Sequence, residues 1–82
     1  MQTLFINAND YTTSRELHLA LQRLLRLPAH YGCNADALYD CLSERRETVN
    51  LYILSHGNED VADALRKCAM VIEDLGGSVK EV

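Results

Sequence analysis

The sequence predicts a small α/β domain in which short strands form a parallel sheet packed by α-helices. Short apolar runs occur at residues 3–6 and 51–54, residues 78–82 are expected to add a final short strand, and segments with helical periodicity lie between them. Strands that alternate with helices in this way pair in parallel, because each helix returns the chain to the same end of the sheet. A chain of 82 residues is long enough for one such core and too short for two.

The first helix is predicted to begin after Thr13, because Thr13 and Glu16 have the spacing of a capping box. Apolar side chains then recur at helical spacing and form a face that is expected to be core: Leu17, Ala20, Leu21, Leu24 and Leu25. Pro28 ends this helix, since the residue before a proline is forced out of the helical region. His18 and His56 are expected to be surface or interface histidines without a functional signal.

The second half of the chain predicts two more helices and two more strands. Asn34 is a good N-cap for a short helix that runs to about Ser43 and buries Leu38, Cys41 and Leu42. The strand at 51–54 is apolar throughout, which is typical of a sheet covered on both faces. Asn58 is the expected cap of the longest helix, and Gly76 its C-terminal glycine cap. Its apolar stripe consists of Val61, Leu65, Cys68, Ile72 and Leu75.

Composition and charge exclude several classes of function. The net charge of −4 and the isoelectric point of about 5.2 argue against nucleic acid or an anionic membrane as partner, and favour a basic partner. No apolar stretch approaches the roughly 20 residues that span a bilayer, and residues 1–7 lack the pattern of a signal peptide. We therefore expect a cytoplasmic protein with three reduced cysteines.

The most one-signed stretch of the chain is the acidic segment at residues 29–44, with three acidic residues and no Lys or Arg. Asp36 and Asp40 are one helical turn apart, so both carboxylates lie on one helix face. Tyr31 and Tyr39 are expected to add aromatic surface beside them, as in many protein interfaces. Charge and spacing alone also fit an ordinary solvated helix face. A catalytic carboxylate pair would need an apolar pocket, which nothing here predicts.

His30, Cys33 and Cys41 raise the alternative of a small metal- or thiol-dependent enzyme. His-x-x-Cys can supply half of a zinc site, but a structural site needs four ligands and a second pair is missing. A Cys–His nucleophile would need an orienting third group that the sequence does not show. Cys41 is expected to be a small core residue. The residues therefore favour a binding protein without metal or cofactor.

Residues 27–42, with the sequence LPAHYGCNADALYDCL, resemble the signature of the barstar family of ribonuclease inhibitors. That signature has leucine-proline, two aromatic residues and glycine, followed by asparagine, aspartate-alanine-leucine, an aromatic residue and aspartate-cysteine-leucine. Upstream, residues 16–18 and 25–28 are similar to its first helix, and residues 5–7 to the end of its first strand. The resemblance is dense up to Leu42 and looser beyond it.

The resemblance implies a three-stranded parallel sheet packed by helices and an intracellular inhibitor, monomeric when free, of a basic ribonuclease of an extracellular type. In this family the second helix and the loop before it plug the active site of the enzyme. By this resemblance Asp40 is the carboxylate that inserts deepest and Asp36 its partner one turn earlier. Gly32 and Asn34 shape the loop, while His30 and Tyr31 occupy the two aromatic positions.

Several residues depart from the family pattern. His30 replaces a tyrosine that covers the mouth of the active site, Tyr39 replaces a tryptophan at the rim, and Cys33 replaces an acidic residue. A further acidic contact on the last helix aligns with Val71, with Glu73 close by. The main alternative is therefore a barstar-like interaction module that binds a different toxin or a protein that is not a nuclease.

Overall fold

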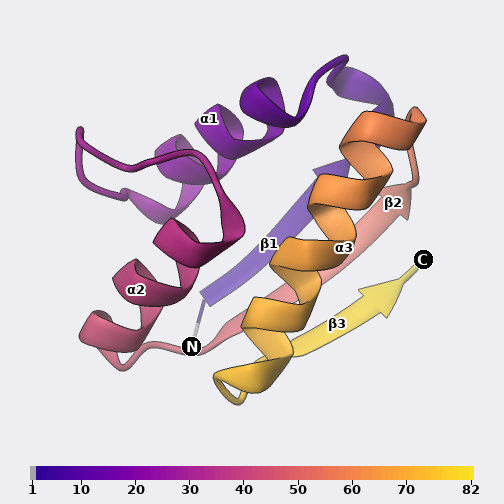
Figure 1. Cartoon of the computed structure of the whole chain (residues 1–82). Coiled ribbons are helices and arrows are strands. Elements are labelled where there is room, and N and C mark those ends of the chain that lie inside the picture. The colour runs from indigo at the N-terminus through magenta and orange to yellow at the C-terminus, as the bar shows by residue number, and fades with distance from the viewer. Residues whose placement is uncertain (1) are drawn as a thin grey trace.

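The computed structural model describes residues 2–82 and contains one sheet of three parallel strands (Figure 1). The strands are β1 (Gln2–Asn7), β2 (Val49–Ser55) and β3 (Ser78–Glu81), and β2 lies between the other two. In the register of the parallel pairs, Leu4 lies opposite Leu51, which lies opposite Val79. The expected barstar-like α/β fold with a three-stranded parallel sheet is confirmed.

Three α-helices and one short 3-10 helix, η1 (Ala8–Asp10), connect the strands. They are α1 (Ser14–Leu25), α2 (Ala35–Arg45) and α3 (Glu59–Asp74). The predicted caps are confirmed, because the side chains of Thr13, Asn34 and Asn58 each accept a hydrogen bond from a backbone N–H of the first turn. No helix within residues 2–82 has the length and apolarity that a transmembrane segment requires.

The side chain of Arg45, the last residue of α2, binds the end of α1. Arg26 and Arg46 follow these helices in the left-handed conformation, with φ of 54° and 56°. The guanidinium of Arg45 donates hydrogen bonds to the carbonyl oxygens of Leu25 and Arg26, two acceptors that the end of α1 leaves open. α2 ends at Arg45, two residues beyond the predicted end at about Ser43.

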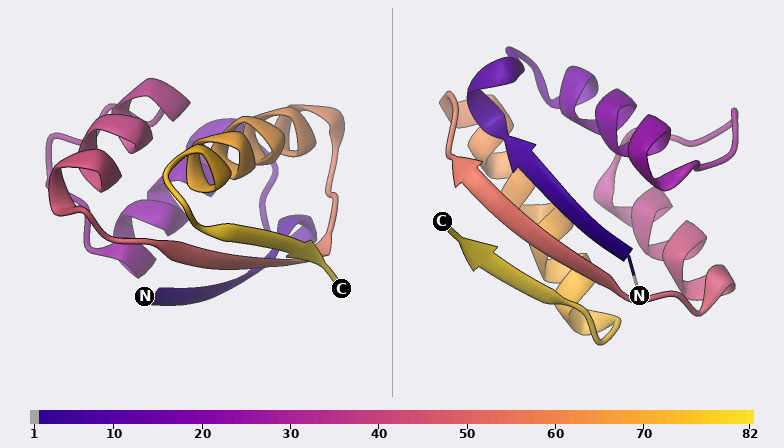
Figure 2. Two further views of the ribbon diagram at one scale, coloured as in Figure 1. Left: turned by 90° about the horizontal axis from the view of Figure 1, so that it is seen from below. Right: turned by 180° about the vertical axis from the view of Figure 1, so that it is seen from behind.

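The helices cover only one face of the sheet (Figure 2). The prediction that both faces are covered is therefore wrong, although every residue from 51 to 54 is apolar. Burial alternates along β2, and Phe5 (62% exposed) and Leu54 (46% exposed) lie on the open face. Phe5 stacks on Tyr52 with ring centroids 5.0 Å apart, which shields part of this apolar surface. Leu24, predicted as core, is also exposed.

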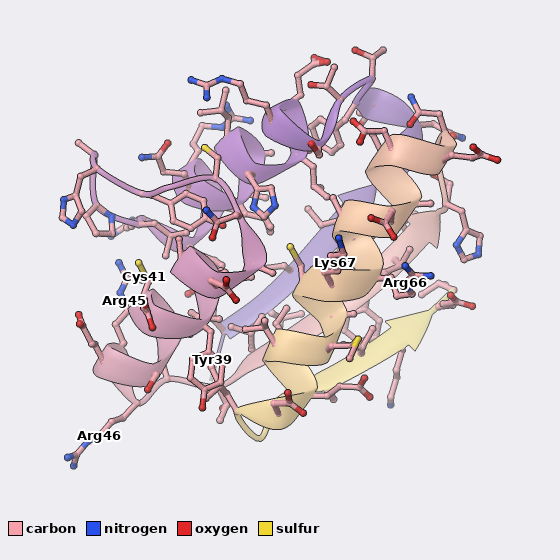
Figure 3. The ribbon with its side chains drawn as sticks, in the orientation of Figure 1. Tyr39, Cys41, Arg45, Arg46, Arg66 and Lys67 are labelled. Carbon is pink, nitrogen blue, oxygen red and sulfur yellow. The ribbon has the colours of Figure 1, made fainter. Side chains whose placement is uncertain are left out.

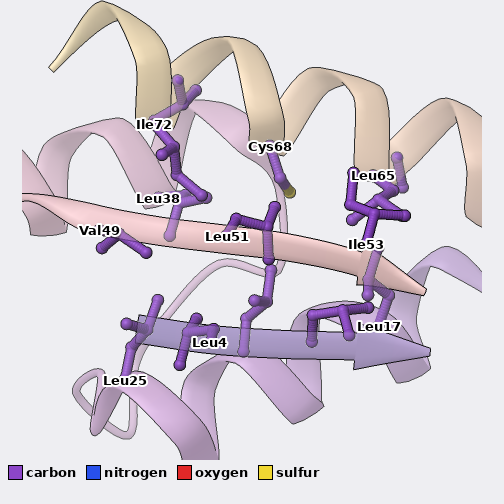
Figure 4. Close-up of a cluster of buried hydrophobic side chains, with 14 of the residues drawn as sticks. Leu4, Leu17, Leu25, Leu38, Val49, Leu51, Ile53, Leu65, Cys68 and Ile72 are labelled. Atoms are coloured by element: carbon purple, nitrogen blue, oxygen red, sulfur yellow. The ribbon is translucent and has the colours of Figure 1, made fainter. Parts of the chain in front are cut away.

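The core lies between the covered face of the sheet and the helices (Figure 4). The strands contribute Leu4, Ile6, Val49, Leu51 and Ile53. The helices contribute fully buried leucines together with most of the predicted stripe of α3: Leu17, Leu21, Leu25, Leu38, Leu42, Val61, Leu65, Cys68 and Ile72. This packing fixes α2 against α3 and leaves the opposite side of α2 exposed.

Gly77 stands where α3 turns into β3, and we expect Gly77→Ala to destabilise the fold by about 1–3 kcal/mol. A Cβ atom there would lie 2.2 Å from the backbone oxygen of Val49 and 2.8 Å from Cγ2 of Ile72, so the backbone itself must shift. Urea unfolding would measure the change. Lys80→Ala, on an exposed position of β3, is the control and should stay within about 0.5 kcal/mol of wild type. Equal midpoints for the two variants would contradict the prediction.

Candidate partner-binding site

The exposed side of α2 carries three carboxylates in one stripe, because Asp36, Asp40 and Glu44 follow one another at intervals of four residues. All three are exposed, and no ion pair found within residues 2–82 includes any of them. Arg45, the nearest cation in sequence, binds the end of α1 and Glu47 instead. The prediction that Asp36 and Asp40 share one helix face is confirmed. Their negative charge is not neutralised within this part of the chain.

The loop before α2 adds exposed groups to the same surface. His30 and Gly32 are exposed, and they line a shallow hollow between the loop and α2 together with Asp40 and Glu44. The structure therefore brings the loop residues and the deeper carboxylate of the predicted site together. Asp36 lies one turn nearer the start of α2 and outside this hollow.

Asn34 connects the loop to the helix. Its side-chain oxygen accepts a hydrogen bond from the backbone N–H of Ala37 at 2.7 Å, and its side-chain nitrogen donates to the backbone oxygen of Gly32 at 3.2 Å. The side chain is exposed, so a partner could reach it as well. Asn34 thus fixes the direction in which the loop enters α2, in agreement with the predicted role of shaping the loop.

Tyr39 is 44% exposed and supplies the aromatic surface that was predicted beside the carboxylates. Figure 3 shows Tyr39 on one flank of α2 and Cys41 on the opposite flank, next to Arg45. Cys41 is only partly buried, so the prediction that it is a core residue is correct only in part.

Tyr31 does not supply aromatic surface, because its side chain is buried in the core. Its hydroxyl lies 2.7 Å from Nδ1 of His18, which is also buried. The prediction of an exposed Tyr31 is wrong, and so is that of a surface His18. Burial raises the pKa of Tyr31 far above its ordinary value and lowers the pKa of His18. The sequence did contain a signal for His18, which falls beside Leu21 and Leu25 on the apolar stripe of α1.

The residues of the metal or thiol alternative are divided between two places. His30 and Cys41 line the hollow beside Asp40, whereas Cys33 lines a different hollow between α1 and α3. Within residues 2–82, no group of three or more His, Cys, Asp or Glu side chains is arranged to hold a metal ion. All three cysteines are free thiols.

Val71, with which the resemblance aligns a late acidic contact of the family, is buried on α3. Glu73, two residues further along α3, is exposed.

Comparison with protein families agrees with this geometry. The family model described as Barstar (barnase inhibitor) matches residues 1–80. The chain belongs to this family. Barstars are inhibitors and not catalysts, so membership supports a role as a ribonuclease inhibitor in general. The match also covers the region after Leu42, where the resemblance of single residues is looser.

Proposed function

We propose that this chain is an intracellular inhibitor of a basic, barnase-type ribonuclease and that it plugs the active site of the enzyme with α2 and the preceding loop. The observation that carries the proposal is the stripe of exposed carboxylates on α2, which no ion pair found within residues 2–82 includes. It lies within a chain that matches the barnase-inhibitor family over residues 1–80.

The chemistry of the inhibition is substitution of carboxylates for phosphates. A ribonuclease binds the RNA backbone with Arg, Lys and His side chains, and carboxylates form strong, charge-assisted hydrogen bonds with the same groups. Asp40 sits beside the hollow between the loop and α2, where it can enter such a cluster while His30 covers the rim. Asp36 adds a second carboxylate one turn earlier, near the positive end of the helix dipole.

The same carboxylates have a cost in the free protein. Like charges four residues apart on a helix repel by a few tenths of a kcal/mol per pair. Asp36, Asp40 and Glu44 form two such pairs, and a cationic partner would relieve both repulsions on binding. A helix that served only to keep the protein in solution would gain from a basic residue at one of these positions.

The substitutions around the carboxylates favour a partner that differs in detail from barnase. An imidazole at His30 is smaller than a phenol and can carry a positive charge, and Tyr39 offers less area than an indole. A toxin of another class that recognises the same carboxylates is the second candidate. Capture of such a protein, lost on Asp40→Ala, would support it.

Titration against barnase-type ribonucleases tests the proposal, and we expect inhibition whose association rate falls steeply with added salt. The range of electrostatic attraction shrinks from about 30 Å at 0.01 M to about 3 Å at 1 M ionic strength. Charge steering raises association rates by roughly 10- to 1,000-fold, and high salt should remove this gain. Stopped-flow mixing would measure the rate. Failure to inhibit any basic ribonuclease at equimolar concentration would contradict the proposal.

A further inference from the structure

A chain of buried polar groups connects three elements behind the partner-binding site. Nε2 of His18 on α1 lies 3.9 Å from Sγ of Cys68 on α3, and Nδ1 of His18 lies 2.7 Å from the hydroxyl of Tyr31. That hydroxyl donates to the backbone oxygen of Asn34, the N-cap of α2, at 3.4 Å. His18, Tyr31 and Cys68 are all buried.

Each group in this row of polar groups can donate one hydrogen bond to the next, from Cys68 through His18 and Tyr31 to Asn34. If Tyr31 donates its single hydroxyl proton to Asn34, its oxygen must accept from Nδ1–H of His18. Nε2 of His18 is then unprotonated and accepts the weak hydrogen bond of the Cys68 thiol. Burial raises the pKa of Cys68 to about 12, so this thiol keeps its proton. With neutral His18 protonated at Nδ1, every donor in this row of groups therefore has an acceptor.

This row of hydrogen-bonded groups ends in the segment that carries the predicted contacts. Tyr31 lies between the exposed residues His30 and Gly32, and its own backbone N–H donates to the carbonyl oxygen of Pro28 at 3.0 Å. Asn34 directs the loop into α2 through its bonds to Gly32 and Ala37. A change at His18 would therefore reach the loop and the start of α2 through one side chain, that of Tyr31.

We propose that His18 is a positioning residue, which holds the loop at residues 28–34 and the start of α2 in the binding arrangement through Tyr31, and that protonation of His18 releases them. This inference rests on the proposed function. It goes beyond that function because it gives the inhibitor a response to acid that is located in its core.

No ion pair found within residues 2–82 includes His18. The hollow beside it is lined by the titratable side chains of Cys33, Asp60, Asp63 and Lys67. Asp63 pairs with Lys67 and Arg66, and Asp60 accepts a hydrogen bond from the backbone N–H of Ser14, so these carboxylates are already engaged. The groups in contact with the imidazole are the neutral phenol and thiol, both weak partners for a cation.

We call the arrangement in which Tyr31 holds the loop and the start of α2 the docked state, and its loss the opened state. Protonation of His18 therefore disfavours the docked state in a definite pH window. The pKa of docked His18 is lowered by burial from its ordinary value of 6.5, whereas a solvated His18 in the opened loop would keep the ordinary value. Above pH 6.5 both states hold neutral His18, and docking does not depend on pH. As the pH falls below 6.5, the opened state binds a proton first, and the docked state loses stability about tenfold per pH unit until its own pKa is reached.

Amide hydrogen exchange of the free inhibitor tests this without any partner. The amides of Tyr31 and Ala37 report on the loop and on the start of α2, since both are hydrogen-bonded there. Between about pH 7.5 and pH 5.5, after correction for intrinsic exchange, their opening constants should rise in wild type, by up to about tenfold. His18→Asn keeps a donor near Nδ1 but does not titrate, so its opening constants should stay constant. Equal pH profiles for wild type and His18→Asn would overturn the inference.

A binding experiment with the inhibited ribonuclease tests whether this positioning affects affinity for the partner. Tyr31→Phe retains the ring and removes only the hydroxyl, and we expect its affinity to fall about two- to tenfold because the loop must then be ordered on binding. The ratio of the dissociation constants of wild type and His18→Asn, measured in the same buffers, cancels the titration of the enzyme and should rise as the pH falls. Unchanged affinity of Tyr31→Phe together with a constant ratio would contradict the inference. Absence of any binding by wild type would instead contradict the proposed function and leave the exchange result standing.

Discussion

Asp40→Ala is expected to lose most of the affinity for a barnase-type ribonuclease while the fold remains intact. Asp40 is exposed and makes no ion pair within residues 2–82, so its removal takes nothing from the free protein and relieves repulsion from Asp36 and Glu44. In the complex, the cations that it meets would be left buried without a partner. Truncation of one member of a buried charge pair costs about 2–5 kcal/mol, a range drawn in part from the barnase–barstar pair itself, which corresponds to roughly 30- to several thousand-fold in affinity.

The matched control for this prediction is Asp10→Ala, which removes the same charge from η1. Both variants change the net charge from −4 to −3, so both should lose a similar small part of the long-range attraction to a basic enzyme. Only Asp40→Ala should accelerate dissociation, because this rate depends on short-range contacts. Equal dissociation rates for the two variants would show that α2 is not the contact surface.

The fold was predictable where one local pattern decides one local structure. Thr13, Asn34 and Asn58 each precede a periodic segment, and an N-cap needs only the backbone N–H groups that follow it. The covering of the sheet was not predictable in this way. The apolar run predicts that Tyr52 and Leu54 are buried. A helix on the second face would be needed to bury them, and the helices of residues 2–82 all lie on the other face. Stacking of Phe5 on Tyr52 is a long-range contact that no local pattern contains.

In the candidate site, too, the features set by local pattern were predictable and those set by tertiary contacts were not. The common face of Asp36 and Asp40 follows from helical spacing alone. Tyr31 and Tyr39 look alike in the sequence, yet one is buried and the other is 44% exposed. The difference arises because Tyr31 finds a hydrogen-bond partner in the core, His18, from another helix. The family resemblance gave the predicted positions of the site, whereas the connection from Tyr31 to the core required the tertiary structure.

The helix that carries the predicted site contributes few buried side chains, and Leu38→Ala should therefore be the most destabilising change in α2. Leu38 and Leu42 are the only two fully buried side chains that α2 contributes within the described part of the chain, and Leu38 has no exposed surface. Loss of a buried leucine side chain costs about 2–5 kcal/mol through lost burial and the cavity that remains. For a domain whose total stability is on the order of 5–15 kcal/mol, this is a large fraction. Urea unfolding followed by circular dichroism would measure it.

Leu24→Ala is the control for this change, since it deletes the same atoms from a leucine that is 40% exposed and should cost less than about 1 kcal/mol. Well below its unfolding midpoint, Leu38→Ala should still inhibit with a dissociation constant close to that of wild type, because the carboxylates on the outer side of α2 are unchanged. Asp40→Ala should show the reverse, with unchanged stability and lost inhibition. A loss of both properties in both variants would contradict the separation of a buried supporting face from an exposed binding face.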